Sequence, residues 1–158
     1  RYNSNIKYLV HNNQVFALTI AEPSPVTEIG YKDKTTPQGV KLAPMNPIKM
    51  LLGAGATFVA RIFADVNQVK QVLEEADKHK GFSFIEIIQP CVVFHSDLGY
   101  KEKTYDLQKT EHDKSDFKAA MEKAEEFNYN GVRQGTKIPM GIFYQNENKP
   151  VFEELLKK

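Results

Sequence analysis

The sequence is poor in cysteine, with Cys91 as the only thiol among 158 residues. One thiol cannot form an intrachain disulfide, and it cannot supply a CxxC zinc site within this chain. This cysteine usage is typical of the reducing cytoplasm, and we expect that location. Long hydrophobic runs are missing too. None approaches the ~20 residues of a membrane span, and no stretch has the pattern of a signal peptide, so we expect no membrane among its partners.

An excess of charge of one sign is also missing. Lysine and arginine number 21 and aspartate and glutamate 20, which gives a formal net charge of +1. Without a broad basic field, nucleic acid is not an expected partner. The sequence also lacks the glycine-rich loops of Rossmann and P-loop proteins, and it lacks the HExxH motif. These absences exclude the usual nucleotide-binding loops and a zinc-protease site.

What is present is an alternation of strand and helix patterns. We expect strands over residues 5–11, 57–63, 82–88 and 138–144, with a helix in each of the three intervals. The apolar run of the first strand is continuous, so we expect burial on both of its faces. Strand, helix, strand, helix, strand is the βαβ order, whose right-handed crossovers join parallel strands. The predicted fold is α/β, with a mostly parallel sheet and flanking helices.

Capping residues and helix breakers predict where these helices begin and end. Asn46 and Pro47 suit the N-cap and first position of one helix, and Asp65 suits the N-cap of the next. We expect Asp113 or Ser115 to cap the third. The remaining segments are predicted to be a long proline- and glycine-broken loop over 22–45, a polar surface excursion over 95–111 and a short helix over 150–158.

The strongest candidate for a binding site is the end of the first strand. Asn12 and Asn13 stand where that strand stops, and the carbonyl of Val15 follows two residues later. Ligands of open α/β sheets bind at the carboxyl ends of strands. Amide and carbonyl oxygens are hard donors that suit magnesium together with a phosphate group. Asparagine pairs also form turns without any ligand, and this alternative stays open.

Cys91 is the second candidate, because it follows a proline at the end of another predicted strand. A lone cysteine is either a small buried hydrophobic residue or one thiolate of a cluster whose other ligands come from elsewhere. The four histidines are scattered along the chain, and we interpret them as surface or capping residues rather than catalysts. They are His11, His79, His95 and His112.

Three segments, taken in order and spacing, resemble the beta subunit of 2-oxoacid:ferredoxin oxidoreductases, which binds thiamine diphosphate. The segments are HNNQVFALT at 11–19, GAGATFVAR at 53–61, and KGFSF at 80–84 followed by QPCV at 89–92. The closing IPMGIFY at 138–144 also matches the family. The resemblance covers nearly the whole chain and implies that residues 1–158 are the C-terminal part of a single thiamine-diphosphate-binding domain.

The resemblance implies ligands for two metal centres. Asn13, through its side-chain oxygen, and Val15, through its carbonyl, match the magnesium ligands of the diphosphate motif, and Thr19 matches a polar residue near the diphosphate. The motif's Gly-Asp-Gly half is expected before Arg1. Cys91 matches the fourth cysteine ligand of a [4Fe–4S] cluster, whose other three cysteines are also expected upstream.

The implied reaction is oxidative decarboxylation of a 2-oxoacid, with electrons passing through the cluster to ferredoxin and the acyl group to coenzyme A. The alpha subunit supplies the glutamate that activates thiamine, so this chain offers no catalytic acid or base and is expected to be inactive alone. Because the implied enzyme contains the alpha subunit as well as this chain, we expect an oligomer. One departure concerns residues 20–22, which read Ile-Ala-Glu where many relatives have Lys or Gly and then Gly-Gln. Substrate and coenzyme A contacts at those positions are therefore not carried over.

Two other interpretations remain open at the level of sequence. The chain could be another thiamine-dependent decarboxylase or a transketolase-like domain, neither of which needs a cysteine after the third strand. It could instead be a non-catalytic α/β module that docks a partner subunit through segments 22–45 and 95–111.

Overall fold

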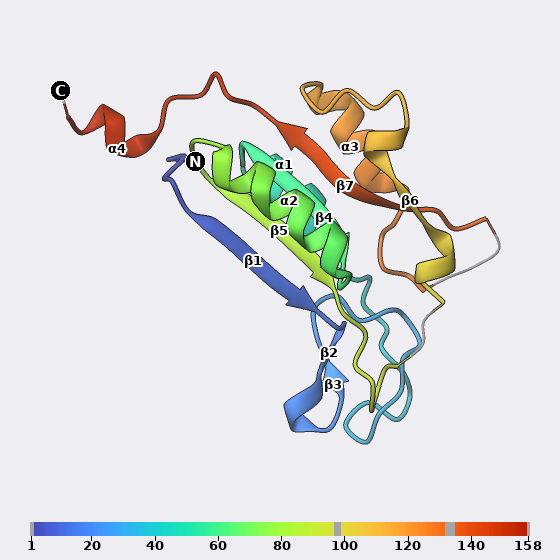
Figure 1. Ribbon diagram of the computed structural model, residues 1–158. Helices are drawn as coiled ribbons and strands as arrows, with labels where there is room; N and C mark the ends of the chain where they lie inside the picture. Colours follow the sequence, from blue (N-terminus) through green and yellow to red (C-terminus); the bar gives the residue numbers. More distant parts are fainter. Residues whose placement is uncertain (1, 97–98, 132–134, 158) are drawn as a thin grey trace.

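The computed structural model describes residues 2–96, 99–131 and 135–157, and it has an α/β architecture built on one five-stranded sheet (Figure 1). The strand order is β1 (Lys7–Asn12), β5 (Ser83–Ile88), β4 (Phe58–Phe63), β7 (Ile138–Gln145) and β6 (Thr104–Asp106). The first three strands are parallel to one another, β7 is antiparallel to β4, and β6 is parallel to β7. The predicted α/β class with a mostly parallel sheet is confirmed.

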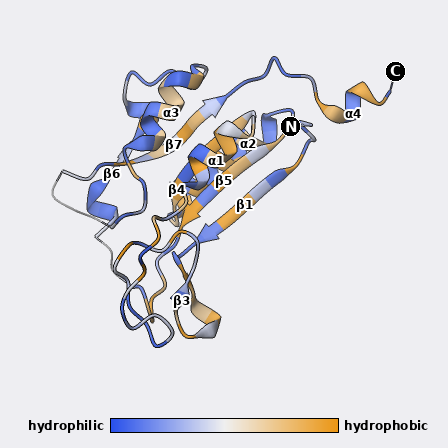
Figure 2. Ribbon diagram, turned by 180° about the vertical axis from the view of Figure 1, so that it is seen from behind, coloured by the Kyte–Doolittle hydropathy of each residue, from blue (hydrophilic) through white to orange (hydrophobic). Residues whose placement is uncertain are grey.

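Helices cover both faces of this sheet. The helices are α1 (Pro47–Gly53), α2 (Val66–Lys78), α3 (Phe117–Glu125) and a short α4 (Phe152–Leu155). Buried residues of α1 and α3 pack against one face, and those of α2 pack against the other. Hydrophobic residues concentrate on the central strands between these layers (Figure 2). Within the described residues, no helix is long and apolar enough to cross a membrane.

The first two helices begin where the sequence predicts. Asn46 accepts a hydrogen bond from the backbone N–H of Lys49 at 3.1 Å, with Pro47 in the first turn. Asp65 caps α2 in the same way. These caps work because their side-chain oxygens satisfy N–H groups that have no partner inside the helix.

The third helix begins later than predicted. Its N-cap is Asp116, which accepts from two backbone N–H groups of the first turn. Asp113 instead accepts from Ser115 in the turn before the helix, at 2.7 Å to the hydroxyl and 2.8 Å to the backbone N–H. Neither predicted cap was right, because several capping residue types follow one another here and only the chain path selects among them.

Burial of the first strand on both faces was a wrong prediction. In β1, Tyr8 remains 55% exposed and Leu9 38% exposed. The strand pairs with β5 alone and forms the edge of the described sheet. A continuous apolar run reports hydrophobicity, and it does not report how many neighbours a strand has.

The two predicted loop segments turn out differently. Segment 22–45 is a long loop, as expected, apart from the two-residue strand β3 (Glu22–Pro23), which pairs with β2 (Val15–Phe16) around the 3-10 turn η1 (Ala17–Thr19). Segment 95–111 is not merely a surface excursion. It contains β6 between the 3-10 turns η2 (Lys101–Lys103) and η3 (Leu107–Lys109), and Leu107 is fully buried. Tyr100 is buried as well, and Tyr105 packs against the core, so a few apolar side chains hold this largely polar segment on the sheet.

Candidate functional site

The candidate site lies where the neighbouring strands β1 and β5 end together. Asn12 stands opposite Ile88 in the parallel register, so the turns that follow both strands share one edge of the sheet. Two hydrogen bonds join these turns. The Gln89 N–H donates to the Asn12 carbonyl at 2.9 Å, and Nδ1 of His11 lies 2.7 Å from the Gln89 side-chain oxygen.

The first of these turns, residues 12–15, is here called the strand-end turn. The side-chain oxygen of Asn12 accepts from the N–H of Gln14 at 2.9 Å, and that of Asn13 accepts from the N–H of Val15 at 3.1 Å. Gln14 adopts a left-handed conformation with φ 62°. The two overlapping asparagine turns reverse the chain within a few residues, so that Asn13 and Val15 flank one sharp bend.

The oxygen atoms of the strand-end turn fit a magnesium ion that also binds a phosphate. Each oxygen can accept more than one bond, so the Asn13 side chain keeps capacity beyond its bond from Val15. Pro23 stands opposite Val15 in the β2–β3 pair and has no N–H to offer the Val15 carbonyl. Among the described residues, no group of three His, Cys, Asp or Glu side chains could hold a metal. Amide and carbonyl donors of this kind suit magnesium with cofactor oxygens in its shell.

Two cavities meet at Asn13. One, of about 390 Å³, is lined by both Asn13 and Cys91. The other, of about 370 Å³, is lined by Asn13 and Val15 together with residues of β1 and α1. Thr19 lines neither cavity; it is exposed, and its hydroxyl donates to the Phe16 carbonyl at 3.1 Å. Asn13 thus shares one cavity with Cys91 and the other with Val15, while Thr19 lies apart from both.

Cys91 is a free, partly exposed thiol in a tight turn. The N–H of His95 donates to its carbonyl at 3.0 Å. Backbone N–H groups of Phe94 and Val93 at the sulfur hold the pKa of the Cys91 thiol below its usual value. The lowered pKa favours the thiolate, which is the form of cysteine that binds metals.

His95 is a residue of this site that the sequence interpretation missed. It is buried, not on the surface, with Nδ1 3.2 Å from the Asn13 carbonyl and Nε2 3.0 Å from a carboxylate oxygen of Glu28. Burial is the largest single influence and would raise the pKa of Glu28, but the hydrogen bond with His95, a backbone hydrogen bond and the electrostatic interaction with His95 together hold the pKa below its usual value. His95 thereby ties the strand-end turn to the loop over 22–45, a contact that no local motif signals.

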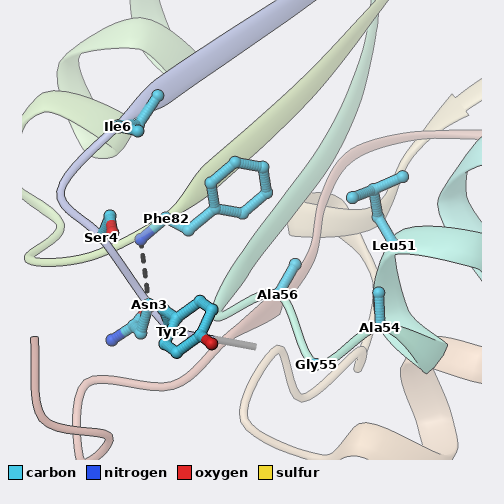
Figure 3. Close-up of a pocket in the computed structure, with 9 residues that line it drawn as sticks. All are labelled: Tyr2, Asn3, Ser4, Ile6, Leu51, Ala54, Gly55, Ala56 and Phe82. Atoms are coloured by element: carbon cyan, nitrogen blue, oxygen red, sulfur yellow. Dashed lines mark hydrogen bonds between the residues drawn. The ribbon is translucent and has the colours of Figure 1, made fainter. Parts of the chain in front are cut away.

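A separate pocket of about 260 Å³ lies at the opposite end of β1 (Figure 3). Its amide side chain, Asn3, is already engaged by the protein. The Asn3 oxygen accepts from the hydroxyl of Thr57 at 2.6 Å and from the N–H of Phe82 at 3.0 Å. The Asn3 nitrogen donates to the carbonyls of Lys149 and Pro150. This amide joins the chain ends to the sheet and does not mark a second reactive centre.

Comparison with family models gives two matches along the chain. Residues 1–87 match the thiamine pyrophosphate enzyme, C-terminal TPP binding domain. Residues 91–158 match the C-terminal model of the pyruvate ferredoxin oxidoreductase beta subunit. The first match contains the strand-end turn, and the second begins at Cys91.

Individual relatives agree with these models. The chain is 35% identical over 170 residues to the beta subunit of 2-oxoacid:ferredoxin oxidoreductase 1 from Aeropyrum pernix, covering 99% of this chain and 51% of that protein. It is 36% identical over 166 residues to the corresponding subunit from a Sulfolobus species, covering 99% and 54%. The chain therefore spans about half the length of the curated relatives it matches.

A solved structure is similar over the same extent. It is a 2-oxoglutarate:ferredoxin oxidoreductase from Magnetococcus marinus with 2-oxoglutarate, coenzyme A and succinyl-CoA bound. The TM-score is 0.87 at 31% sequence identity, covering 99% of this chain and 52% of that one.

Proposed function

Because the chain belongs to the thiamine pyrophosphate enzyme family, as a C-terminal portion of a 2-oxoacid:ferredoxin oxidoreductase beta subunit, we propose that it binds thiamine diphosphate and magnesium at the strand-end turn. The whole enzyme would oxidatively decarboxylate a 2-oxoacid, transfer the acyl group to coenzyme A and pass electrons to ferredoxin. Its partners would be the alpha subunit and ferredoxin within a cytoplasmic oligomer. The observation that carries the proposal is the cavity shared by Asn13 and Cys91 at the ends of adjacent strands.

Each residue of the site has a defined task in this proposal. Asn13 would coordinate magnesium through its side-chain oxygen and Val15 through its carbonyl, which holds the diphosphate against the carboxyl end of β1. Cys91 would supply one thiolate ligand of a [4Fe–4S] cluster, and its neighbouring N–H groups favour the deprotonated form. Thr19, at the exposed end of η1, would be the outermost polar contact near the diphosphate.

The cofactor, when bound, supplies the electron sink that decarboxylation requires. The chain's own contribution is to bind and orient. The left-handed bend at Gln14 keeps Asn13 and Val15 beside each other. Asn13 and Cys91 line one cavity at the same edge of the sheet, which supports a short path for electron transfer between the proposed cofactor and the proposed cluster.

Calorimetric titration with magnesium and thiamine diphosphate, on the protein in its native assembly, tests the proposal. Asn13→Ala should weaken magnesium-dependent binding by at least about tenfold, because the loss of a direct metal ligand should cost no less affinity than the loss of a residue that supports a ligand. Asn13→Asp keeps an oxygen ligand and should retain binding. Asn67→Ala, at an exposed position of α2, is the control and should match the parent. Binding by Asn13→Ala that equals the parent would overturn the assignment.

A further inference from the structure

A buried charged network runs through the sheet toward the strand-end turn. Arg61 of β4 and Glu86 of β5 are register partners with fully buried side chains. Arg61 Nε donates to Glu86 Oε2 at 2.8 Å, and the Tyr129 hydroxyl donates to the same oxygen. Arg61 Nη2 in turn donates to the Tyr129 hydroxyl at 2.8 Å. The oxygen Oε2 is therefore fully engaged on the side that faces away from β1.

The other carboxylate oxygen of Glu86 reaches the strand-end turn. Asn12 Nδ2 donates to Glu86 Oε1 at 2.7 Å, and both side chains are buried. An amide offers a donor on one side and an acceptor on the other. Once its nitrogen is turned to the carboxylate, its oxygen must face the Gln14 N–H, which it accepts at 2.9 Å. Turning the amide over would set oxygen against carboxylate and nitrogen against N–H, two repulsive contacts.

Gln14 needs this support because its conformation is costly. A residue other than glycine at φ 62° lies in the left-handed region, which side chains disfavour. Its carbonyl is held as well, by the hydroxyls of Ser24 at 2.9 Å and of Thr27. Such a conformation is maintained by surrounding contacts, and it is enriched at functional sites.

We propose that Glu86 is a positioning residue for the strand-end turn: by fixing the orientation of the Asn12 amide, it maintains the Gln14 bend that sets Asn13 beside Val15. The inference rests on the proposed function for its consequence, which is cofactor affinity. Its structural content concerns the Gln14 bend and is measurable without cofactor.

Glu86→Gln tests the inference with a nearly isosteric change. Arg61 and Tyr129 both donate toward this position, so the new amide turns its oxygen to them and its nitrogen to Asn12. The Asn12 amide then turns over, and Gln14 loses its acceptor. The double variant Asn12→Asp with Glu86→Gln restores the pattern, because the new carboxylate accepts from both the new amide and the Gln14 N–H.

Two further variants separate orientation from general loosening. Tyr129→Phe removes the hydroxyl's bonds with Glu86 Oε2 and Arg61 Nη2 but leaves the bond between Glu86 Oε1 and Asn12, so it should lower stability and leave the Gln14 bend in place. Asn12→Ala keeps the Arg61–Glu86 pair but removes both the bond to Glu86 and the acceptor of the Gln14 N–H, so it shows the exchange expected once that acceptor is lost. If Glu86→Gln does not fold, a double variant that exchanges Gln14 as fast as Asn12→Ala overturns the inference.

The experiment measures amide hydrogen exchange over residues 12–15 and titration with magnesium and thiamine diphosphate, both on the protein in its native assembly. Glu86→Gln and Asn12→Ala should exchange the Gln14 amide about tenfold faster, the effect of losing one buried hydrogen bond, and should weaken cofactor binding by a similar factor. The double variant should recover both, and Tyr129→Phe should stay near the parent in both. Parent-like Gln14 exchange in Glu86→Gln overturns the inference, whatever Asn12→Ala shows. A parent protein that binds no cofactor overturns the proposed function instead, and the exchange result still decides the role of Glu86.

Discussion

Arg61 and Glu86 form an ion pair between neighbouring parallel strands, with 2.8 Å between Nε and Oε2 and no solvent exposure of either side chain. The Arg61 guanidinium also lies over the rings of Phe127, Tyr129 and Phe143 at 5.1–5.3 Å. A buried charge that loses its partner is costly, so this pair should be sensitive to substitution of either member.

Arg61→Met should lower the free energy of unfolding by about 3–5 kcal/mol, because it leaves the Glu86 carboxylate buried without its partner charge. Urea denaturation measures the change. Lys70→Met is the control, since its pair with Glu74 is exposed and 4.0 Å long, and its cost should stay within about 0.5 kcal/mol. Equal effects of the two substitutions would contradict the role assigned to the buried pair.

Gly81→Ala should disrupt the hydrogen bonds by which Asn3 connects the chain ends to the sheet. A Cβ at Gly81 would lie 2.5 Å from the Asn3 side-chain oxygen, and the backbone there has φ 121°. Gly131→Ala is a matched control with φ 74° and open space around the new methyl group. Both variants bear a backbone cost of about 1–2 kcal/mol, and Gly81→Ala should lose at least about 1 kcal/mol more through the clash. Thermal unfolding compares them, and similar melting temperatures would refute the prediction.

Cys91→Ser should abolish or strongly reduce the iron–sulfur cluster of the native assembly, because the hydroxyl is a poor substitute for a thiolate ligand. Iron content and the electron paramagnetic resonance signal of the reduced protein report the loss. Val92→Ser, at a neighbouring position that is 85% exposed, should keep the parent's iron content. Full iron content and an unchanged signal in Cys91→Ser would remove this residue from the cluster.

Glu28→Gln should make stability less dependent on pH in the acid range. Burial opposes ionisation of Glu28, but its hydrogen bonds with His95 and the backbone, together with the electrostatic interaction with His95, leave its pKa below the ordinary value of 4.5. A carboxyl whose pKa is lower in the folded state stabilises the fold fully above the unfolded value and loses that contribution as pH falls through the folded value. The parent should therefore exceed Glu28→Gln in stability at neutral pH, with a gap that closes below about pH 4.5. Denaturation at several pH values gives the two curves, and parallel curves would be the contrary result.

Ile20→Gly should stabilise the protein. Ile20 has φ 65° and is 57% exposed, so a β-branched side chain is held in the left-handed region with little burial in return. Relief of about 1–2 kcal/mol of strain exceeds the added chain entropy of glycine, about 0.4–1 kcal/mol. Leu18→Gly, in the same turn at a position that is 98% exposed and without a positive φ, should be slightly destabilising. Differential scanning calorimetry would refute the argument if both variants melted below the parent.

Much of the fold could be predicted because local signals determine it. The caps at Asn46 and Asp65 lie where expected, and the central strands follow their apolar runs closely. The edge position of β1 could not be predicted, since the number of neighbours of a strand depends on segments far away in the chain. The same holds for β6, whose pairing with β7 joins residues more than thirty positions apart.

For the candidate site, the sequence by itself determined which ligand atoms are available: amide and carbonyl oxygens at one strand end and a thiol at another. Only the tertiary structure decided that these strand ends are neighbours, because the pairing of β1 with β5 brings Asn13 and Cys91 to a common cavity. It also decided the partners of buried polar groups. Glu86 meets Arg61 and Asn12, and His95 meets Glu28, across stretches of 25 to 74 residues. Such pairs exist because a buried charge or amide must find a partner, and the fold selects which one it finds.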